Sequence, residues 1–202
     1  TVGGNPFLLD EPQATNLITY SQDASNSNWV KTAAIIVSNT TNAPDNTLTA
    51  FKLIGDTSGN VIHSIRQTPT FNANESPVIT LHAKFSDLQY VYVGGLGRNP
   101  NNLEGYVWFD LQNGTVGFAS SGYSGNIVSL INGWFKITVF CPISTVSANR
   151  EARIGLSDTN GGQNYTGDGV KGVFIWGIQL ETGVLGTSYI PTTTSAVTRN
   201  AD

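Results

Sequence analysis

The chain has 202 residues, of which 39% are hydrophobic and only 12% are charged, and its formal net charge is −4. This length and apolar content suffice for one large domain. The charged residues form no basic cluster, which argues against a nucleic-acid partner because contacts to phosphates need grouped lysine and arginine. No apolar run approaches the roughly 20 residues of a spanning helix, so we expect no insertion into a membrane.

Short segments of alternating apolar and polar residues run through the centre of the chain, separated by Gly, Asn, Asp and Pro. In chain order they predict strands at 48–54, 61–71, 77–85, 88–96, 103–111, 115–120, 133–143, 151–158 and 173–181. Asn113-Gly114 predicts a tight hairpin between the fifth and sixth of these strands. The pattern therefore predicts an all-β fold, an antiparallel two-sheet β-sandwich with almost no helix.

The two ends of the chain differ in composition from this centre. We expect residues 1–15 to be a lead-in segment, 16–191 to form the sandwich domain, and 192–202, which are rich in Thr and Ser, to be a linker. The chain contains no methionine, and we expect it to be a segment of a longer protein.

Alternation along each strand assigns an inner and an outer face. In 77–85, Ile79, Leu81 and Ala83 share the side that we expect to be core, and His82 shares the other side with Lys84. In 88–96 and 103–111 the aromatic residues oppose the valines. If these strands are neighbours, one outer face carries a candidate carbohydrate platform made of Tyr90, Tyr92, Tyr106, Trp108, Asp110, His82, Lys84 and Trp134.

Such a platform suits a polysaccharide or surface glycan as partner. Flat aromatic rings match the apolar CH faces of sugar rings, and nearby charged and imidazole groups supply hydrogen bonds to hydroxyls. The alternative is a scaffold or protein interface without a small ligand, because cross-strand aromatic pairs also stabilise a sheet by roughly 0.2–1 kcal/mol.

Residues that could carry catalysis are scattered. His63 and His82 lie in separate predicted strands without a nucleophile nearby in the sequence. An acid pair for glycoside hydrolysis would have to come from Asp110, Glu104, Glu151 or Asp158, which form no close constellation. We therefore expect no enzyme, and a polysaccharide-degrading enzyme is the third hypothesis. Cys141 is the only cysteine, which excludes a disulfide scaffold and predicts a small buried side chain.

Two segments carry a family resemblance: FLLDEPQATNLITYSQDASNSNW (7–29) and YTGDGVKGVFIWGIQLETGVLGTSYIPTTTSAVTRNAD (165–202). They resemble the opening and closing segments of a β-sandwich module in phage virion proteins such as tail and head fibres. The resemblance implies a non-catalytic carbohydrate-binding module that assembles in the host cytoplasm and adheres at the bacterial surface. It also implies neighbouring domains of a longer fibre, and it leaves the oligomeric state open. The alternative within the same family is a purely structural fibre module.

A looser resemblance extends to the jelly-roll carbohydrate-binding modules of glycosidases, which are lectin-like. It implies one structural Ca²⁺, and the candidate ligands here are Asp23, Gln179 and Glu181. The chain departs from that pattern by placing Trp176-Gly177 where those modules carry an acidic residue.

Two tryptophans lie inside the framework segments. Trp29 and Trp176 are both expected in the core, the latter because it alternates in phase with Phe174, Ile178 and Leu180.

Overall fold

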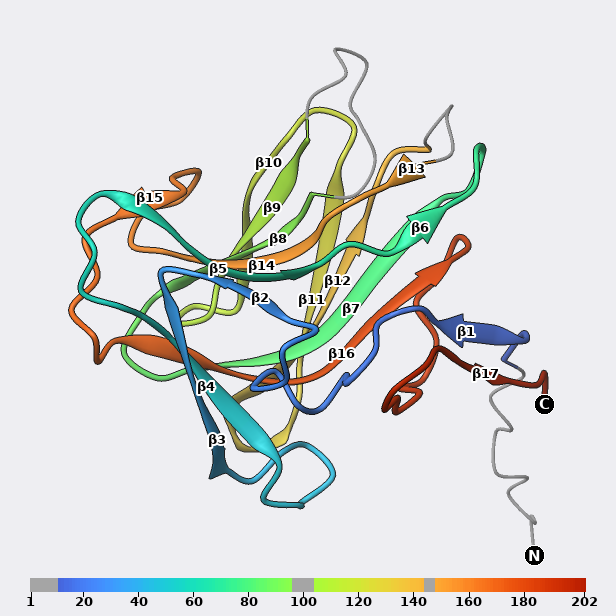
Figure 1. The fold of residues 1–202 in the computed structure, drawn as a ribbon, viewed down its shortest axis with the longest axis horizontal. Coiled ribbons are helices and arrows are strands. Elements are labelled where there is room, and N and C mark those ends of the chain that lie inside the picture. The colour runs from blue at the N-terminus through green and yellow to red at the C-terminus, as the bar shows by residue number, and fades with distance from the viewer. Residues whose placement is uncertain (1–10, 96–103, 144–147) are drawn as a thin grey trace, which may run out of the picture.

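The computed structural model describes residues 11–95, 104–143 and 148–202, and it is an antiparallel β-sandwich of the jelly-roll type (Figure 1). The chain passes repeatedly from one sheet to the other, and helix within the described residues is limited to a single 3₁₀ turn at Ile131–Gly133. The predicted fold class is therefore confirmed. In the described part of the chain, no helix has the length and apolar character needed to cross a membrane.

The first sheet contains the strands that carry the predicted aromatic residues. Its order is β10 (Thr115–Ala119), β9 (Tyr106–Asp110), β8 (Tyr90–Gly94), β14 (Ala152–Ser157), β5 (Val61–Gln67) and β15 (Asn164–Tyr165), with β2 (Val30–Thr32) also paired to β5. Gly114, at φ 66°, closes the β9–β10 turn, so the predicted Asn113-Gly114 hairpin is confirmed.

The second sheet packs against the first and contains the longest strand, β16 (Gly172–Thr182). Its order is β11 (Ser124–Ser129), β12 (Trp134–Phe140), β7 (Pro77–Phe85), β16, β4 (Ala50–Gly55) and β3 (Ala34–Thr41). The sequence analysis missed β3 and β11, which are the two edge strands of this sheet. Both alternate weakly and expose several apolar side chains, such as Ile35 and Val128.

The core lies between the two sheets and follows the predicted alternation. Ile79, Leu81 and Ala83 of β7 are buried in it and face the valines of β8 and β9. Trp29 and Cys141 also belong to this cluster, as predicted. Burial raises the pKa of the Cys141 thiol, so the side chain acts as a small apolar group.

The two ends of the described chain pair with each other. Figure 1 shows β1 (Ala14–Asn16) beside β17 (Val197–Arg199) to the right of the two sheets, and Glu11 forms an ion pair with Arg199 at 2.5 Å. The predicted boundaries after residues 15 and 191 therefore do not coincide with ends of regular structure. A second small ladder joins β6 (Thr70–Phe71) to β13 (Ala148–Asn149).

Candidate functional site

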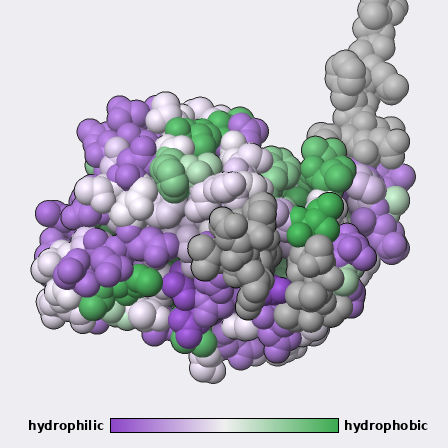
Figure 2. Space-filling model, turned by 90° about the horizontal axis from the view of Figure 1, so that it is seen from above, coloured by the Kyte–Doolittle hydropathy of each residue, from purple (hydrophilic) through white to green (hydrophobic). Residues whose placement is uncertain are grey.

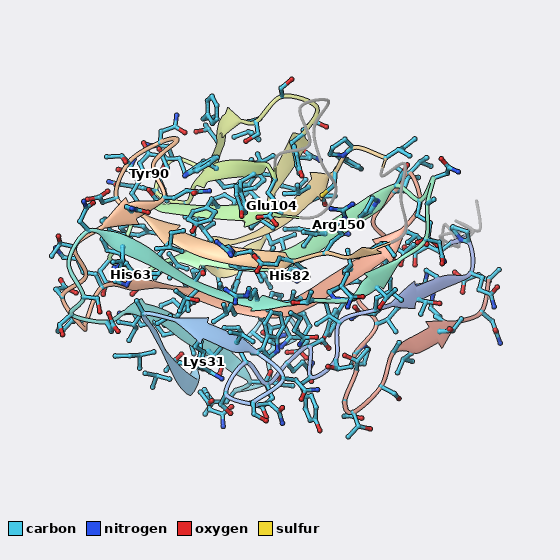
Figure 3. The ribbon with its side chains drawn as sticks, turned by 45° about the horizontal axis from the view of Figure 1, so that its top comes forward. Lys31, His63, His82, Tyr90, Glu104 and Arg150 are labelled. Carbon is cyan, nitrogen blue, oxygen red and sulfur yellow. The ribbon has the colours of Figure 1, made fainter. Side chains whose placement is uncertain are left out.

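The predicted platform residues fall on opposite sides of the molecule. β8 and β9 are neighbours, so Tyr92 lies opposite Trp108, and Tyr90 opposite Asp110, on the outside of the first sheet. β7 and β12 are also neighbours, and they place His82, Lys84 and Trp134 on the outside of the second sheet. The prediction of a single face is wrong, because the short connection between β7 and β8 carries the chain across the sandwich. Figure 3 shows the labelled Tyr90 and His82 well apart.

The outer face of the first sheet is closed by its own side chains. We call Tyr92, Tyr106 and Trp108 the aromatic cluster, and their side chains are only 0%, 6% and 3% exposed. The rings contact one another at centroid distances of 5.2–6.1 Å. Trp108 Nε1 donates a hydrogen bond to the carbonyl oxygen of Gly162 at 2.6 Å.

Neighbouring groups complete this cover. The ring of Tyr92 lies against Gly155 of β14, where a side chain would collide with it. Burial raises the pKa of Tyr92 to about 12. Asp110 is engaged in the β9–β10 turn, where its carboxylate accepts hydrogen bonds from Gln112, Asn113 and Gln89. Of the predicted residues on this face, only Tyr90 is half-buried and reachable.

The outer face of the second sheet is open and holds a pocket of about 300 Å³. β7, β12 and β16 form its floor. One wall comes from the β3–β4 loop, and the other from the segment Thr187–Tyr189, which we call the strap. The lining residues are Pro44, Asp45, Thr80, His82, Lys136, Trp176, Gly177, Gln179, Thr187, Ser188 and Tyr189.

Two aromatic rings lie side by side in this pocket. Trp176 and Tyr189 have ring centroids 4.7 Å apart, and His82 lies 5.2 Å from Trp176. Trp176 Nε1 donates to the hydroxyl of Thr49 at 2.9 Å, and the Tyr189 hydroxyl is bonded to that of Ser21 at 2.5 Å. Each ring is therefore held in place by a hydrogen bond of its own polar atom.

Trp176 reaches the pocket because β16 changes phase. Val173 and Ile175 face the core before Gly177, whereas Ile178 and Leu180 face it afterwards. The register shift against β7 lies between Trp176 and Gln179, and Gly177 adopts φ 61°, which glycine tolerates best. Trp176 is buried in a hydrophobic cluster, as predicted, but it is not in phase with Ile178 and Leu180: it packs with Ala43, Ala50 and Trp134 on the outer face of the second sheet.

Two buried polar atoms in the pocket have no hydrogen-bond partner within the described part of the chain: His82 Nδ1 and Thr80 Oγ1. Such atoms cost free energy when they are left unpaired, roughly 1–3 kcal/mol each. Burial and the nearby charge of Lys136 lower the pKa of His82 to about 4, so the imidazole is neutral near pH 7. A neutral imidazole and a hydroxyl can both bond to a polar ligand.

The strap is fixed by the residues that were predicted to bind calcium. Gln179 accepts a hydrogen bond from the backbone N–H of Ile190 at 2.6 Å, and Glu181 accepts from Thr187 at 2.6 and 2.9 Å. Asn16, which is fully buried, donates to the carbonyl oxygens of Ile178 and Ile190. These bonds explain why the closing segment of the chain folds back over β16.

The predicted calcium ligands do not form a set. Asp23 is exposed and its carboxylate bonds to Ser25, whereas Gln179 and Glu181 are buried and bonded to the strap. Among the residues described, no three His, Cys, Asp or Glu side chains are grouped so that they could hold a metal ion. Asp23, Gln179 and Glu181 therefore do not by themselves supply the six to eight oxygens that Ca²⁺ takes.

The other titratable residues considered from sequence have structural contacts. His63 is buried, with its two ring nitrogens 2.5 and 3.1 Å from the carbonyl oxygens of Ala33 and Tyr165. Glu151 pairs with Arg66 and Arg153, and Glu104 accepts a hydrogen bond from the Tyr106 hydroxyl at 3.2 Å.

Sequence reasoning missed most of the pocket. Tyr189 lies in the closing segment that carries the family resemblance, Gln179 was assigned to calcium, and Thr80 was not singled out. One local signal was available: Trp176-Gly177 interrupts an otherwise apolar strand, and a glycine there is typical of a bulge. The approach of the strap and the β3–β4 loop has no local signal.

The chain is thus an antiparallel β-sandwich with a pocket on one outer face. Comparison with known proteins adds little to this description. No family model matches the chain, and no curated protein sequence matches it either. Among solved structures, one from Bacteroides thetaiotaomicron VPI-5482, described provisionally as a sugar binding protein, aligns over 83% of this chain and 94% of that chain. The sequence identity is 16% and the TM-score 0.39, a similarity that identifies neither a family nor a ligand.

Proposed function

We propose that this chain is a non-catalytic carbohydrate-binding module of a phage virion or fibre protein, which holds bacterial surface or extracellular polysaccharide in the pocket on the second sheet. The observation that carries the proposal is the pairing of two aromatic rings, Trp176 and Tyr189, with unpartnered polar atoms of His82 and Thr80. Apolar ring surface beside convergent hydrogen-bonding groups is the combination that a sugar requires.

The binding face in this proposal differs from the one expected first. His82 remains in it and Lys84 lies beside it, and the aromatic cluster of the first sheet does not take part, because none of its residues lines this pocket. Trp176 is itself only 5% exposed, so the half-buried Tyr189 offers the more accessible ring. Asp45 contributes an exposed carboxylate at the rim, which can accept hydrogen bonds from sugar hydroxyls.

A matched pair of tyrosine variants tests the proposal. Tyr189→Ala removes a half-buried ring from the pocket, and Tyr90→Ala removes a half-buried ring from the other face. On a glycan array followed by calorimetry, we expect Tyr189→Ala to weaken binding by about 0.5–1.5 kcal/mol, the scale of aromatic contacts, and Tyr90→Ala to leave it unchanged. Equal binding by both variants would move the site elsewhere.

The structural alternative has its own outcome in this experiment. A purely structural fibre module would bind none of the acidic, neutral or amino-sugar polysaccharides on the array, although the protein is folded. In that case the pocket would be a contact surface for a neighbouring domain.

Calcium is tested separately. A cation that binds only the folded state raises its stability by mass action, so a chelator would lower the melting temperature reversibly. The hydrogen bonds of Gln179 and Glu181 lead us to expect no such change. Restoration of a chelator-lowered melting temperature by added Ca²⁺ would reinstate the calcium site.

A further inference from the structure

The lysines of the chain differ in their partners, and Lys31, which does not line the pocket, has its ammonium bonded to the carbonyl oxygens of Ser25, Asn26 and Trp29 instead of to a carboxylate. Lys52 pairs with Asp87 at 2.7 Å, and Lys171 with Asp168 at 3.7 Å. Lys84 and Lys136 form no ion pair within the described residues. Lys136 Nζ has one long hydrogen bond, 3.5 Å, to the carbonyl oxygen of Thr187 in the strap.

These two lysines are close neighbours on one face. Lys136 lies opposite His82, and Lys84 opposite Trp134, across the β7–β12 ladder. The lysines are therefore diagonal neighbours, a relation that places residues about 7–8 Å apart. Both side chains are half-buried, so solvent screens their mutual repulsion less than it would for exposed groups. An anion bound between them would relieve that repulsion.

Asp45 is the other charged residue that lines the pocket, and it belongs to the wall formed by the β3–β4 loop. Its Oδ1 accepts hydrogen bonds from Thr47, and it pairs with neither lysine. The pocket thus offers the ammonium group of Lys136 on its floor, a carboxylate at its rim, and the Trp176–Tyr189 rings beside them, with Lys84 next to it on the same face.

We infer that the pocket selects an acidic saccharide, one that carries carboxylate or sulfate groups. This inference rests on the proposed function. The apolar face of the sugar contacts Trp176 and Tyr189, and its hydroxyls bond to Asp45 and His82. Its acidic group bonds to Lys136, and Lys84 attracts the next acidic residue of the polymer. A neutral sugar would leave both lysines without an anion.

The test uses matched ligands on the whole chain. The probes are a hexuronic acid oligosaccharide, its fully methyl-esterified form, and a sulfated oligosaccharide of neutral hexose. By calorimetry we expect at least one acidic probe to bind about tenfold more tightly than the ester, because a charge-assisted hydrogen bond contributes about that factor. The acidic probe that does so identifies the acidic group. Added salt should reduce the preference.

Variants locate the preference. Lys136→Gln should reduce the acid-to-ester ratio to near one, and Lys136→Arg should keep the preference. Lys171→Gln is the control, since Lys171 is exposed and does not line the pocket. Thermal melts of each variant establish that it is folded.

The outcomes separate the two proposals. If the wild-type chain binds acidic probes and ester equally and Tyr189→Ala weakens both, the proposed function stands and acid selection is wrong. Acid selection by Lys136 is also wrong if Lys136→Gln keeps the preference. If no saccharide binds, the proposed function itself fails.

Discussion

The two outer faces of this sandwich carry similar residues and have opposite characters. The first sheet presents Tyr92, Tyr106 and Trp108, which pack mainly edge to face and are closed to solvent, with Trp108 bonded to Gly162. The second sheet presents Trp176 and Tyr189, which border an open pocket. Aromatic residues on an outer face therefore do not by themselves make a binding surface. The difference lies in Tyr189, which is half-buried and lines a pocket, whereas Trp176, at 5% exposure, is as buried as the rings of the aromatic cluster. Figure 2 shows the surface from above, where apolar areas are small and separated by polar ones.

The largest expected effect is a loss of stability when the aromatic cluster of the first sheet is disrupted. Trp108→Ala should lower the free energy of unfolding by about 3–5 kcal/mol, because it leaves a cavity and removes the hydrogen bond to Gly162. Urea denaturation measures this. Phe118→Ala is the control, since Phe118 touches the same ring but is 53% exposed, and it should cost much less. Loss of glycan binding with unchanged stability in Trp108→Ala would show that the closed face is the binding face.

The next effect is the pH dependence of stability that comes from His82, on the outer face of the second sheet. The folded-state pKa of His82 is lowered to about 4 from an ordinary value of 6.5 by burial and by Lys136. The His82 imidazole is therefore protonated below about pH 6.5 in the unfolded chain, but only below about pH 4 in the folded chain. The stability linked to His82 is present above pH 6.5 and is lost as the pH falls through this window, by on the order of 3 kcal/mol.

Urea denaturation at pH 7 and at pH 4.5 measures this linkage. His82→Gln should lose less stability than the wild type between the two pH values, since glutamine does not titrate. The carboxylates titrate in both proteins, so the difference isolates His82. Equal losses in the two proteins would mean that His82 is accessible to protons in the folded state.

A smaller effect tests the change of phase in β16. Gly177→Ala should cost about 1–2 kcal/mol because φ 61° is unfavourable for a side chain. An added Cβ would also lie 3.3 Å from His82 Nδ1 and 3.4 Å from the Tyr189 ring, so ligand binding should weaken as well. Gly59→Ala is the matched control, since its nearest neighbour would be 4.0 Å away. If both variants behave alike, Gly177 does not set the geometry of the pocket.

The smallest expected effect is the contribution of Glu11, at the N-terminal end of the described chain, to stability. Burial raises the pKa of Glu11, but hydrogen bonds from Ser188 and the charge of Arg199 outweigh it, and the pKa is lowered overall. The stability from Glu11 is therefore present above the unfolded pKa near 4.5 and is lost as the pH falls through the folded value. Glu11→Gln should reduce stability at pH 7 by about 1 kcal/mol or less. Thermal melts at pH 7 and 3 measure it, and an unchanged melting temperature at pH 7 would mean that the strap is held without Glu11.

The local features of the fold were predictable from sequence. Most strands, the Asn113-Gly114 hairpin, and the inner positions of β7, β8 and β9 follow from alternation and turn chemistry, which act between residues close in the chain. The edge strands β3 and β11 were missed because an edge strand needs less apolar surface. The pairing of β17 with β1 was also missed, and residues 192–202 were expected to be a linker instead. β1 lies at the other end of the sequence, so no local pattern indicates this pairing.

The sequence alone determined which side chains of a strand share a face, because successive residues of any strand point to opposite sides. Only the tertiary structure decided which faces meet. The crossing between β7 and β8 divided the expected platform between two sheets, and the bulge at Gly177 moved Trp176 from the inner to the outer side. The return of the strap to β16, through Gln179, Glu181 and Asn16, then built the pocket wall. These steps depend on contacts between residues far apart in the chain, and such contacts leave no pattern within a single strand.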